Sequence, residues 1–500
     1  MKSHSALPLT TSALRRLAFL AALVVAPTAQ AADASLVGAH FEVRISDLPA
    51  PYQSLAQSDA APEPDHVPVE QIPRAQATLP KVPQGFEVGI FAEGLSGPRE
   101  MAAAPGGIVF VAQMHEGEIV ALRDADGDGV AETSTVFASG FREPSGIAYA
   151  NGALYVADRR AVWRIDFDPA TLKAAPRIMV TRPGALGKGD GHITRELLFE
   201  PDGSHFFVSV GSETNVGEDP APSASIQLFR ADGQMQASVA TGLRNPVGLA
   251  FYPGTDDVYT VVDEREGLGA GLVPDYLTRV KPGSFYGFPY AYLGPHPDPQ
   301  FGDLRPDLVA ATETPDMLFA PRSGPFGLFF CKGESFPPDY QGDALVALHG
   351  SWQEDGRPPV HGIARVRFHD GKPEPGYEMF MAGFEEKSRP EPGSPPRIWG
   401  RPVWLVEAED GALLVSDDVA NVIWRVRWTG KGADVASAGA PVGPSTPEPE
   451  LPDFMAMPTG LFEVPAAAFA EPSTAQFPGM VEPSGIEPLT SSLRTRRSPN

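Results

Sequence analysis

The chain has 500 residues, a formal net charge of -24 and a sequence pI near 4.8. This acidic balance argues against a nucleic-acid partner, because the phosphates would be repelled. The 51 glycines and 54 prolines favour many short strands joined by turns over long helices. A single cysteine, Cys331, excludes an intramolecular disulfide and a cysteine-based metal cluster.

Residues 1–31 have the pattern of a secretory signal peptide. Arg15 and Arg16 precede an apolar run from Leu17 to Ala26, and Ala29-Gln30-Ala31 provides the small residues found before a cleavage site. The run is too short to span a bilayer, and no later stretch is long enough. We therefore expect a periplasmic or secreted protein without a membrane span, in which residues 32–80 form a flexible leader.

Residues 81–430 contain a repeated sequence pattern, in which a glycine and a proline are followed by apolar segments that are expected to be strands. Gly94–Pro98 leads to Ile108–Ala112, and Gly140–Pro144 leads to Leu154–Asp158. The two prolines are about 46 residues apart (144 minus 98), which is typical of four-stranded propeller blades. Two further clear copies and two weaker ones bring the total to six units.

The repeat predicts an all-β fold, a six-bladed β-propeller, with a pair of β-sandwiches as the alternative. The segments Val162–Ile165 and Val422–Val426 alternate apolar and polar residues and are expected to be final strands of their blades. Residues 431–500 are rich in Pro, Ala and Gly and are expected to be a disordered tail.

A polar residue follows an apolar strand at the same point of five units. The residues are Gln113, Asp158, Asp263, His349 and Asp417. In a propeller this position lies near the central channel, so we expect these side chains to surround one opening. The alternative is that the aspartates cap turns.

The loop from residue 124 to residue 132 places carboxylates at alternate positions, as Ca²⁺ prefers. The carboxylates belong to Asp124, Asp126, Asp128 and Glu132. Position twelve of an EF-hand would be Thr135, so the closing bidentate ligand of that motif is absent. A separate structural calcium loop and an acidic β-turn both remain open.

Two stretches carry the most specific chemistry. His192 lies in a glycine-rich loop and can accept a proton near neutral pH. Arg244 and Asn245, which are followed by Pro246, can hold an anion or a carbonyl oxygen. Arg195 is either a second anion donor or a charge at a strand edge.

Six motifs in one order resemble the sorbosone dehydrogenase group of the soluble glucose/sorbosone quinoproteins, over about Lys81 to Trp428. They are Gly191–Arg195, Gly242–Ala250, Val273–Thr278, Tyr286–Tyr290, His349–Trp352 and Gly400–Val403. The resemblance implies a six-bladed propeller that binds pyrroloquinoline quinone and Ca²⁺ and oxidises the aldehyde or hemiacetal carbon of a sugar. Because the chain has no Cys-x-x-Cys-His haem motif, the electrons would leave to an external acceptor.

The resemblance also implies residue roles. His192 matches the general base, Arg244 and Asn245 match the pair on the quinone oxygens, and Arg401 matches an arginine that holds a cofactor carboxylate. Arg195, Asp263 and Trp352 are further cofactor-binding candidates. The backbone carbonyls of Arg265 and Glu266 are the nearest matches to the Ca²⁺ ligands.

The chain departs from the family pattern at several positions, two of which bear on the cofactor. Asp263 stands where the family tends to have asparagine, and Glu354 stands where it has arginine. If that arginine neutralises the cofactor, Glu354 weakens its binding or Arg322 or Arg357 takes over. Two other functions stay open: a calcium-dependent lactonase-type hydrolase that uses Asp158, Asp263 and Asp417, and a non-catalytic binding propeller.

Overall fold

The computed structural model describes most of the chain between residues 36 and 430. The described ranges are 36–51, 67–76, 78–189, 191–269, 271–333, 335–350, 353–354, 361–386 and 394–430. The expected signal peptide and tail lie outside them, as do Trp352 and Arg357. No helix within these ranges has the length and hydrophobicity of a transmembrane segment.

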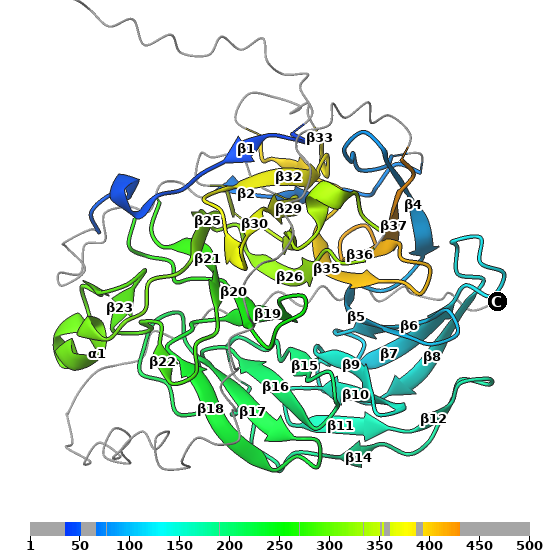
Figure 1. Ribbon diagram of the computed structural model, residues 1–500, viewed down its shortest axis with the longest axis horizontal. Coiled ribbons are helices and arrows are strands. Elements are labelled where there is room, and N and C mark those ends of the chain that lie inside the picture. The colour runs from blue at the N-terminus through cyan, green and yellow to red at the C-terminus, as the bar shows by residue number, and fades with distance from the viewer. Residues whose placement is uncertain are drawn as a thin grey trace, which may run out of the picture. The chain divides into compact units, whose positions relative to one another are not determined.

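Six antiparallel sheets surround a common centre, and the first strand of each is innermost (Figure 1). We number these blades in chain order. Blade 1 consists of β5 (Pro98–Ala104), β6 (Ile108–Gln113), β7 (Glu118–Arg123) and β8 (Thr133–Ser139). Blade 2 consists of β9 (Ile147–Ala150), β10 (Ala153–Ala157), β11 (Val162–Ile165) and β14 (Ile178–Met179). Blade 3 consists of β15 (Leu197–Phe199), β16 (His205–Val210), β17 (Ser225–Arg230) and β18 (Met235–Thr241).

The remaining blades follow the same plan. Blade 4 consists of β19 (Pro246–Phe251), β20 (Val258–Val262), β21 (Pro274–Arg279) and β25 (Met317–Pro321). Blade 5 consists of β26 (Pro325–Phe330), β27 (Ala344–Leu348), β29 (Gly362–Val366) and β32 (Tyr377–Met381). Blade 6 consists of β35 (Pro402–Glu407), β36 (Leu413–Asp417), β37 (Val422–Trp428) and, from the other end of the chain, β4 (Phe86–Glu93). The predicted six-bladed β-propeller is therefore confirmed.

The ring is closed by pairing between the two ends of the propeller sequence. Strand β4 pairs antiparallel with β37, from Glu93 opposite Val422 to Phe86 opposite Trp428. The rings of Phe86 and Trp428 lie 5.0 Å apart between centroids, and Phe380 of blade 5 meets Phe86 edge-on. The closure is thus held by a backbone ladder and by an aromatic contact with the preceding blade.

The expected final strands hold a different position. Val162–Ile165 is β11 and Val422–Trp428 is β37, and each is the third strand of its blade. The outermost strands are the two-residue β14 and the distant β4, neither of which continues the local alternation of its blade. The prediction was wrong at this point, because a short or distant fourth strand leaves no periodic signal next to the third.

Glycines let the innermost strands approach one another. A Cβ on Gly327 would lie 2.9 Å from the carbonyl oxygen of Val403 in the next blade. A Cβ on Gly248 would also meet the backbone of blade 5 at Phe326. Because those approaches are closer than ordinary contact, the small residue at this point brings neighbouring blades together around the centre.

Described parts of the segment before residue 81 also pair with the propeller. Strand β1 (His40–Phe41) pairs with β32, β2 (Val67–Pro68) with β28 (Gln353–Glu354), and β3 (Glu70–Gln71) with β34 (Arg397–Ile398). Strand β34 also pairs with β33 (Glu385–Glu386). Three-residue 3-10 helices occur at η1 (Ile45–Asp47), η2 (Gly302–Leu304) and η3 (Pro338–Tyr340), and α1 spans Pro306–Ala310.

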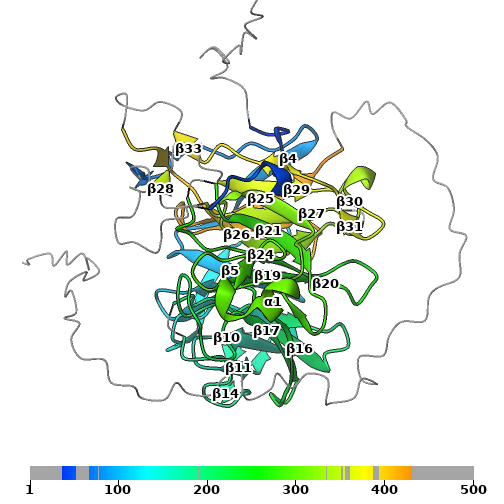
Figure 2. The same ribbon diagram turned by 90° about the vertical axis from the view of Figure 1, so that its left-hand side faces the viewer.

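The small hairpins distinguish the two faces of the ring. Figure 2 places β28 and β33 on one side and the hairpin of β30 (Phe368–His369) and β31 (Lys372–Pro373) on the other. Strand β28 comes directly after β27, the second strand of blade 5, so it lies on the face where the second strand of each blade ends. We call this face the site face. The other extra pairs are β12 (Phe167–Asp168) with β13 (Lys173–Ala174), β23 (Ala291–Tyr292) with β24 (His296–Pro297), and β22 (Ser284–Phe285) with β18.

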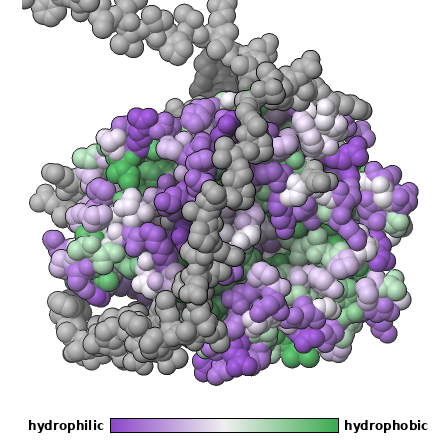
Figure 3. Space-filling view, in the orientation of Figure 1, coloured by the Kyte–Doolittle hydropathy of each residue, from purple (hydrophilic) through white to green (hydrophobic). Residues whose placement is uncertain are grey.

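Hydrophilic side chains cover most of the visible described surface, and hydrophobic ones form separate small areas (Figure 3). This distribution agrees with cores that lie inside and between the blades. One such core joins Val403 and Trp404 of blade 6 to Met101 and Val109 of blade 1. The packing between blades fixes the loops of the site face relative to one another.

Candidate functional site

His192 lies on the site face, in the loop that leads into β15. Its Nδ1 is 3.0 Å from the carbonyl oxygen and 3.0 Å from the hydroxyl oxygen of Ser212, which follows β16 in the same blade. The backbone N–H of His192 also donates to the Ser212 carbonyl, at 3.0 Å. The ring is therefore held at one edge by a single buried serine.

Arg244 and Asn245 reach the same place from the loop before β19. Arg244 donates to the backbone and side-chain oxygens of Asn215, at 3.0 and 2.9 Å. It also donates to the backbone oxygen of Asp263 at 3.1 Å and to its carboxylate at 3.2 Å. Asn245 Nδ2 donates to that carboxylate at 3.3 Å. Asp263 therefore occupies donors of both residues that were predicted to bind quinone oxygens.

Gly211 is the point at which these groups converge. A Cβ there would lie 2.6 Å from Asn245 Oδ1 and 2.6 Å from the Cβ of His192. Asn245 Oδ1 is buried and has no hydrogen-bond partner among the described residues. The predicted base and the predicted donor pair are thus brought together, with an unsatisfied acceptor between them that a ligand hydroxyl would satisfy.

The electrostatic setting keeps the His192 imidazole neutral. Burial lowers the pKa of His192, and the positive charges of Arg244 and Arg195 act in the same direction, while Asp263 opposes them. The neighbouring Glu264 is buried as well, and burial raises the pKa of its carboxyl to about 7. The site therefore offers an unprotonated imidazole at neutral pH, as a general base requires.

Arg195 lies beneath the His192 loop. Its Nη1 donates to the carbonyl oxygens of His192 and Thr194, at 2.8 and 2.7 Å, and its Nε donates to that of Leu186. The residue is 1% exposed, and burial lowers the pKa of its guanidinium to about 10. These contacts make Arg195 a support of the loop, and its contact with a cofactor stays a prediction.

A second polar cluster joins blades 5, 6 and 1 on the same face. Arg401 donates to the carbonyl oxygens of His349 at 2.8 Å and Gly350 at 2.7 Å. Asp418 accepts from Arg99 at 2.8 Å and lies 3.0 Å from His349 Nε2. Arg401 is buried, and burial lowers its pKa to about 10. The cluster concentrates two arginines around one carboxylate, a composition that suits an anionic ligand.

Arg99 and Asp418 were not predicted from the sequence. Arg99 directly follows the repeat segment Gly94–Pro98 and was assigned no separate role. Asp418 was not considered because the neighbouring Asp417 occupies the polar position of its blade. A signal existed in the register, because Asp418 directly follows the polar position of blade 6. Ser212 was missed for a similar reason, since it lies one residue beyond the corresponding position of blade 3, Gly211.

The expected ring of exposed polar groups needs correction. Asp158 and Asp417 are fully buried, and each carboxylate accepts three backbone N–H groups. Gln113 is buried and accepts from the backbone of Ser96 at 2.7 Å. Only Asp263 among the aspartates of the ring keeps a partly exposed side chain, at 28%. The capping interpretation holds for Asp158 and Asp417, because their positions begin tight turns.

The proposed carbonyl ligands for Ca²⁺ already have protein donors. The Glu266 carbonyl accepts from Arg265 Nε at 3.2 Å and from Asn215 Nδ2 at 3.4 Å, and the Arg265 carbonyl accepts from the backbone of Val273. Arg265 also pairs with buried Asp298. A guanidinium beside these oxygens opposes a second cation, so their residues do not fit Ca²⁺ in this arrangement.

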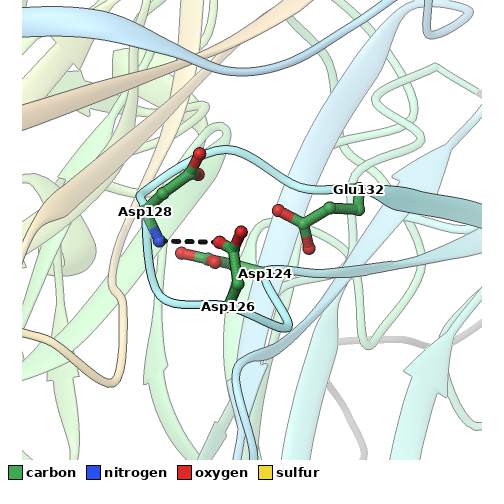
Figure 4. A group of neighbouring side chains, drawn as sticks. All are labelled: Asp124, Asp126, Asp128 and Glu132. Atoms are coloured by element: carbon green, nitrogen blue, oxygen red, sulfur yellow. Dashed lines mark hydrogen bonds between the residues drawn. The ribbon is translucent and has the colours of Figure 1, made fainter.

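The acidic loop of blade 1 lies on the opposite face, because it joins the end of β7 to the start of β8. Four carboxylates gather there, with ligand oxygens within 4.8 Å of one another: Asp124, Asp126, Asp128 and Glu132 (Figure 4). The oxygens accept backbone N–H groups of their own loop, such as that of Gly127 at 2.7 Å. The loop is separate from the His192 site, and calcium binding by it stays a prediction.

Comparisons with known proteins bear on this geometry. Residues 80–271 match a family described as TrAA12-like. An uncharacterized protein of Borreliella burgdorferi is 25% identical, with 69% of this chain and 90% of that protein covered.

Solved structures match over a larger part of the chain. The holo form of the pyranose dehydrogenase PQQ domain from Coprinopsis cinerea has a TM-score of 0.57 and 20% identity, and the match covers 72% of this chain and 100% of that one. A Trichoderma reesei carbohydrate-active enzyme of family AA12 has a TM-score of 0.57 and 19% identity, with coverages of 71% and 100%. The apo form of the soluble aldose sugar dehydrogenase of Escherichia coli has a TM-score of 0.51 and 15% identity, with coverages of 68% and 99%. The chain therefore shares the six-bladed propeller fold of these structures.

Proposed function

We propose that the chain is a quinoprotein oxidoreductase that oxidises the aldehyde or hemiacetal carbon of a sugar, with pyrroloquinoline quinone as cofactor and an external electron acceptor. The Ca²⁺ implied by the resemblance is kept as a variable of the assay, because the carbonyls of Arg265 and Glu266 do not fit it. The proposal rests on one observation above all: His192, Arg244 and Asn245 converge at Gly211 and Ser212. The fold shared with a pyranose dehydrogenase PQQ domain and an aldose sugar dehydrogenase supports it. The signal-like N-terminus motivates the proposal that the enzyme works in the periplasm or outside the cell.

The residues present fit an oxygen-rich, anionic organic ligand. Four of the five N–H groups of Arg244 donate to Asn215 and Asp263, which leaves one N–H of Nη2 for a ligand oxygen. Asn245 Oδ1 can accept a ligand hydroxyl. Arg401 and Arg99, across the centre of the ring, suit a carboxylate.

In the proposed reaction the cofactor accepts the hydride, and residues of the protein remove the proton and stabilise charge. When bound, pyrroloquinoline quinone would supply a carbonyl carbon that accepts hydride. His192 removes the hydroxyl proton of the sugar through Nε2, the ring nitrogen that does not face Ser212. Arg244 stabilises an oxygen that gains negative charge, and the buried setting strengthens this interaction.

The test begins with the purified full chain without cofactor. Pyrroloquinoline quinone and Ca²⁺ are added, and reduction of an artificial dye is followed with a panel of aldoses. Dye reduction that needs the quinone supports the proposal. Failure of both quinone binding and dye reduction would overturn it.

The lactonase alternative has less support. It requires Asp158, Asp263 and Asp417 to face a central ion, yet two of these carboxylates are buried turn caps. Cleavage of lactones with Ca²⁺ alone, without quinone, would nevertheless favour it. Absence of both activities would favour a non-catalytic binding propeller.

A further inference from the structure

Ser212 occupies a junction that none of the proposed roles uses. It is fully buried and follows β16 by two residues. Its carbonyl oxygen accepts from the backbone N–H of His192, and its own N–H donates to the carbonyl oxygen of Arg244 at 2.7 Å. One residue therefore ties the loop of the base to the loop of the donor pair.

The hydrogen bonds of Ser212 determine which nitrogen of the His192 ring carries the proton. Its carbonyl oxygen can only accept, and its hydroxyl proton is directed to the carbonyl oxygen of Thr214, at 2.7 Å. Both Ser212 oxygens therefore present lone pairs to His192 Nδ1, which lies 3.0 Å from each. A hydrogen bond then requires the proton to be on Nδ1, and the neutral ring keeps its lone pair on Nε2.

The carboxylate that often orients a catalytic histidine is replaced here by neutral oxygens. The charged groups that act on the ring are Arg244, Arg195 and Asp263, and Ser212 adds no charge to them. The hydrogen bond to the Ser212 carbonyl raises the pKa of His192, but burial and the charge of Arg244 outweigh it. A full carboxylate charge at this position would oppose their effect. The ring is thus oriented while it remains unprotonated at neutral pH.

We infer that Ser212 is a positioning residue, which fixes His192 as the Nδ1-protonated tautomer and aims Nε2 at the hydroxyl group to be oxidised. The inference rests on the proposed function for its catalytic consequence only. The tautomer itself is a property of the chain without cofactor.

The experiment uses full-length protein with ¹⁵N-labelled histidine and no cofactor. Long-range ¹H–¹⁵N correlation spectra assign the tautomer, and the signal missing in His192→Gln identifies the ring among the 10 histidines. We expect the Nδ1-protonated form in the wild type. Ser212→Ala keeps the backbone carbonyl as an acceptor and loses only the hydroxyl, so the Nδ1-protonated form should remain the major one, with a measurable share of the other tautomer. Ser209→Ala is the matched control, because it removes a buried hydroxyl of β16 that is bonded to Glu196 and does not contact His192.

A second pair of variants tests the neutral anchor. Ser212→Asp should raise the pKa of His192 by about one to three units, and Ser212→Asn should not. In dye reduction, Ser212→Ala should lower kcat about fivefold to tenfold without changing quinone affinity. An Nε2-protonated ring in the wild type, or a tautomer ratio and pKa that none of these variants changes, would overturn the inference. If the spectra behave as expected but sugars are not oxidised, the proposed function alone fails.

Discussion

The His192 site and the acidic loop of blade 1 show two ways in which a propeller presents polar groups. In the loop, one hairpin supplies four carboxylates, mostly exposed, that bond to the amides of their own turn. In the site, blades 3 and 4 supply largely buried groups, and Arg244 bonds across the blades to Asn215. The loop is complete within nine residues of sequence (124 to 132), whereas the site exists only in the folded ring.

The difference in burial between the acidic loop and the His192 site changes the strength of their charge interactions. Exposed carboxylates in water interact weakly with distant charges, so the loop acts mainly on its own surroundings. Asp263 is partly exposed, but it is shared by Arg244 and Asn245, which are buried, so each pairing is stronger than one in open water. Changes at the site should therefore have large effects, and changes at the loop small ones.

The largest effect is expected for His192→Ala. Loss of a general base should lower kcat by about two to four orders of magnitude, with quinone binding retained. Dye-reduction kinetics measure the first quantity, and quenching of protein fluorescence by the quinone measures the second. If quinone binding disappeared together with turnover, the role assigned to His192 would be wrong.

Asp263→Asn should increase affinity for the anionic cofactor. The change removes a negative charge and frees N–H donors of Arg244 and Asn245, so we expect binding to tighten about tenfold. The pKa of His192 should also fall, because Asp263 raises it in the wild type. Titration calorimetry with the quinone checks the affinity.

A matched control for Asp263→Asn is Asp257→Asn, which makes the same charge change on the same blade. Asp257 pairs with Arg279, away from Arg244 and Asn245. Equal gains in affinity for the two variants would show that net charge, and not the freed donors, determines binding.

Acid should destabilise the cluster of blades 5 and 6. Burial, and then the charge of Arg401, lowers the pKa of His349 from 6.5 to about 4 and that of His361 to about 3. The unfolded chain therefore binds protons that the folded chain excludes, so stability is full above about pH 6.5 and falls as the pH decreases. Thermal unfolding between about pH 7 and about pH 5 measures the slope.

The histidine contribution can be separated from the rest of the chain. His361→Asn should flatten this slope, whereas His369→Asn should not, because the His369 side chain is 79% exposed. An unchanged slope in His361→Asn would contradict the assignment.

The smallest effect is expected for Asp128→Asn in the acidic loop. Because the loop lies on the opposite face, turnover and quinone affinity should stay within about twofold of the wild type. Calcium titration followed by the melting temperature separates the two interpretations of the loop. A rise in Tm that Asp128→Asn abolishes indicates a calcium site, and its absence in the wild type indicates an acidic turn.

The sequence predicts features that local chemistry determines. The spacing of glycines and prolines predicted the number of blades. His192 and Arg244 could be placed on one face because each precedes the first strand of its blade, and the two blades are consecutive. The pairing of Arg99 with Asp418 joins residues 319 positions apart, so no local pattern contains it. For Asp158 and Asp417 the sequence left a turn cap and a channel ligand both open, because composition cannot distinguish a buried cap from an exposed ligand.

Asp263 was a candidate for the polar ring and for cofactor binding, but its contacts with Arg244 and Asn245 were not predicted. The sequence identifies the aspartate but not which donors it occupies, since these depend on how two loops meet. The register placed Ser212 one residue beyond the polar position of blade 3, but a Gly-Ser pair after a strand is also common in turns, so this signal was weak. Cross-blade hydrogen bonds are thus the part of the site that required the structure.

Closure of the ring by β4 and β37 also controls when the site can exist during synthesis. Residues 86–93 are synthesised early, but their strand β4 has no pairing partner until residues 422–428 have been synthesised and form β37. The Arg99–Asp418 pair spans this same seam, so it forms only when the last blade has joined the first. A chain interrupted before Trp428 would carry every residue of the His192 loop and still lack a closed ring to hold the two halves of the site together. The complete ring therefore depends on residues 422–428.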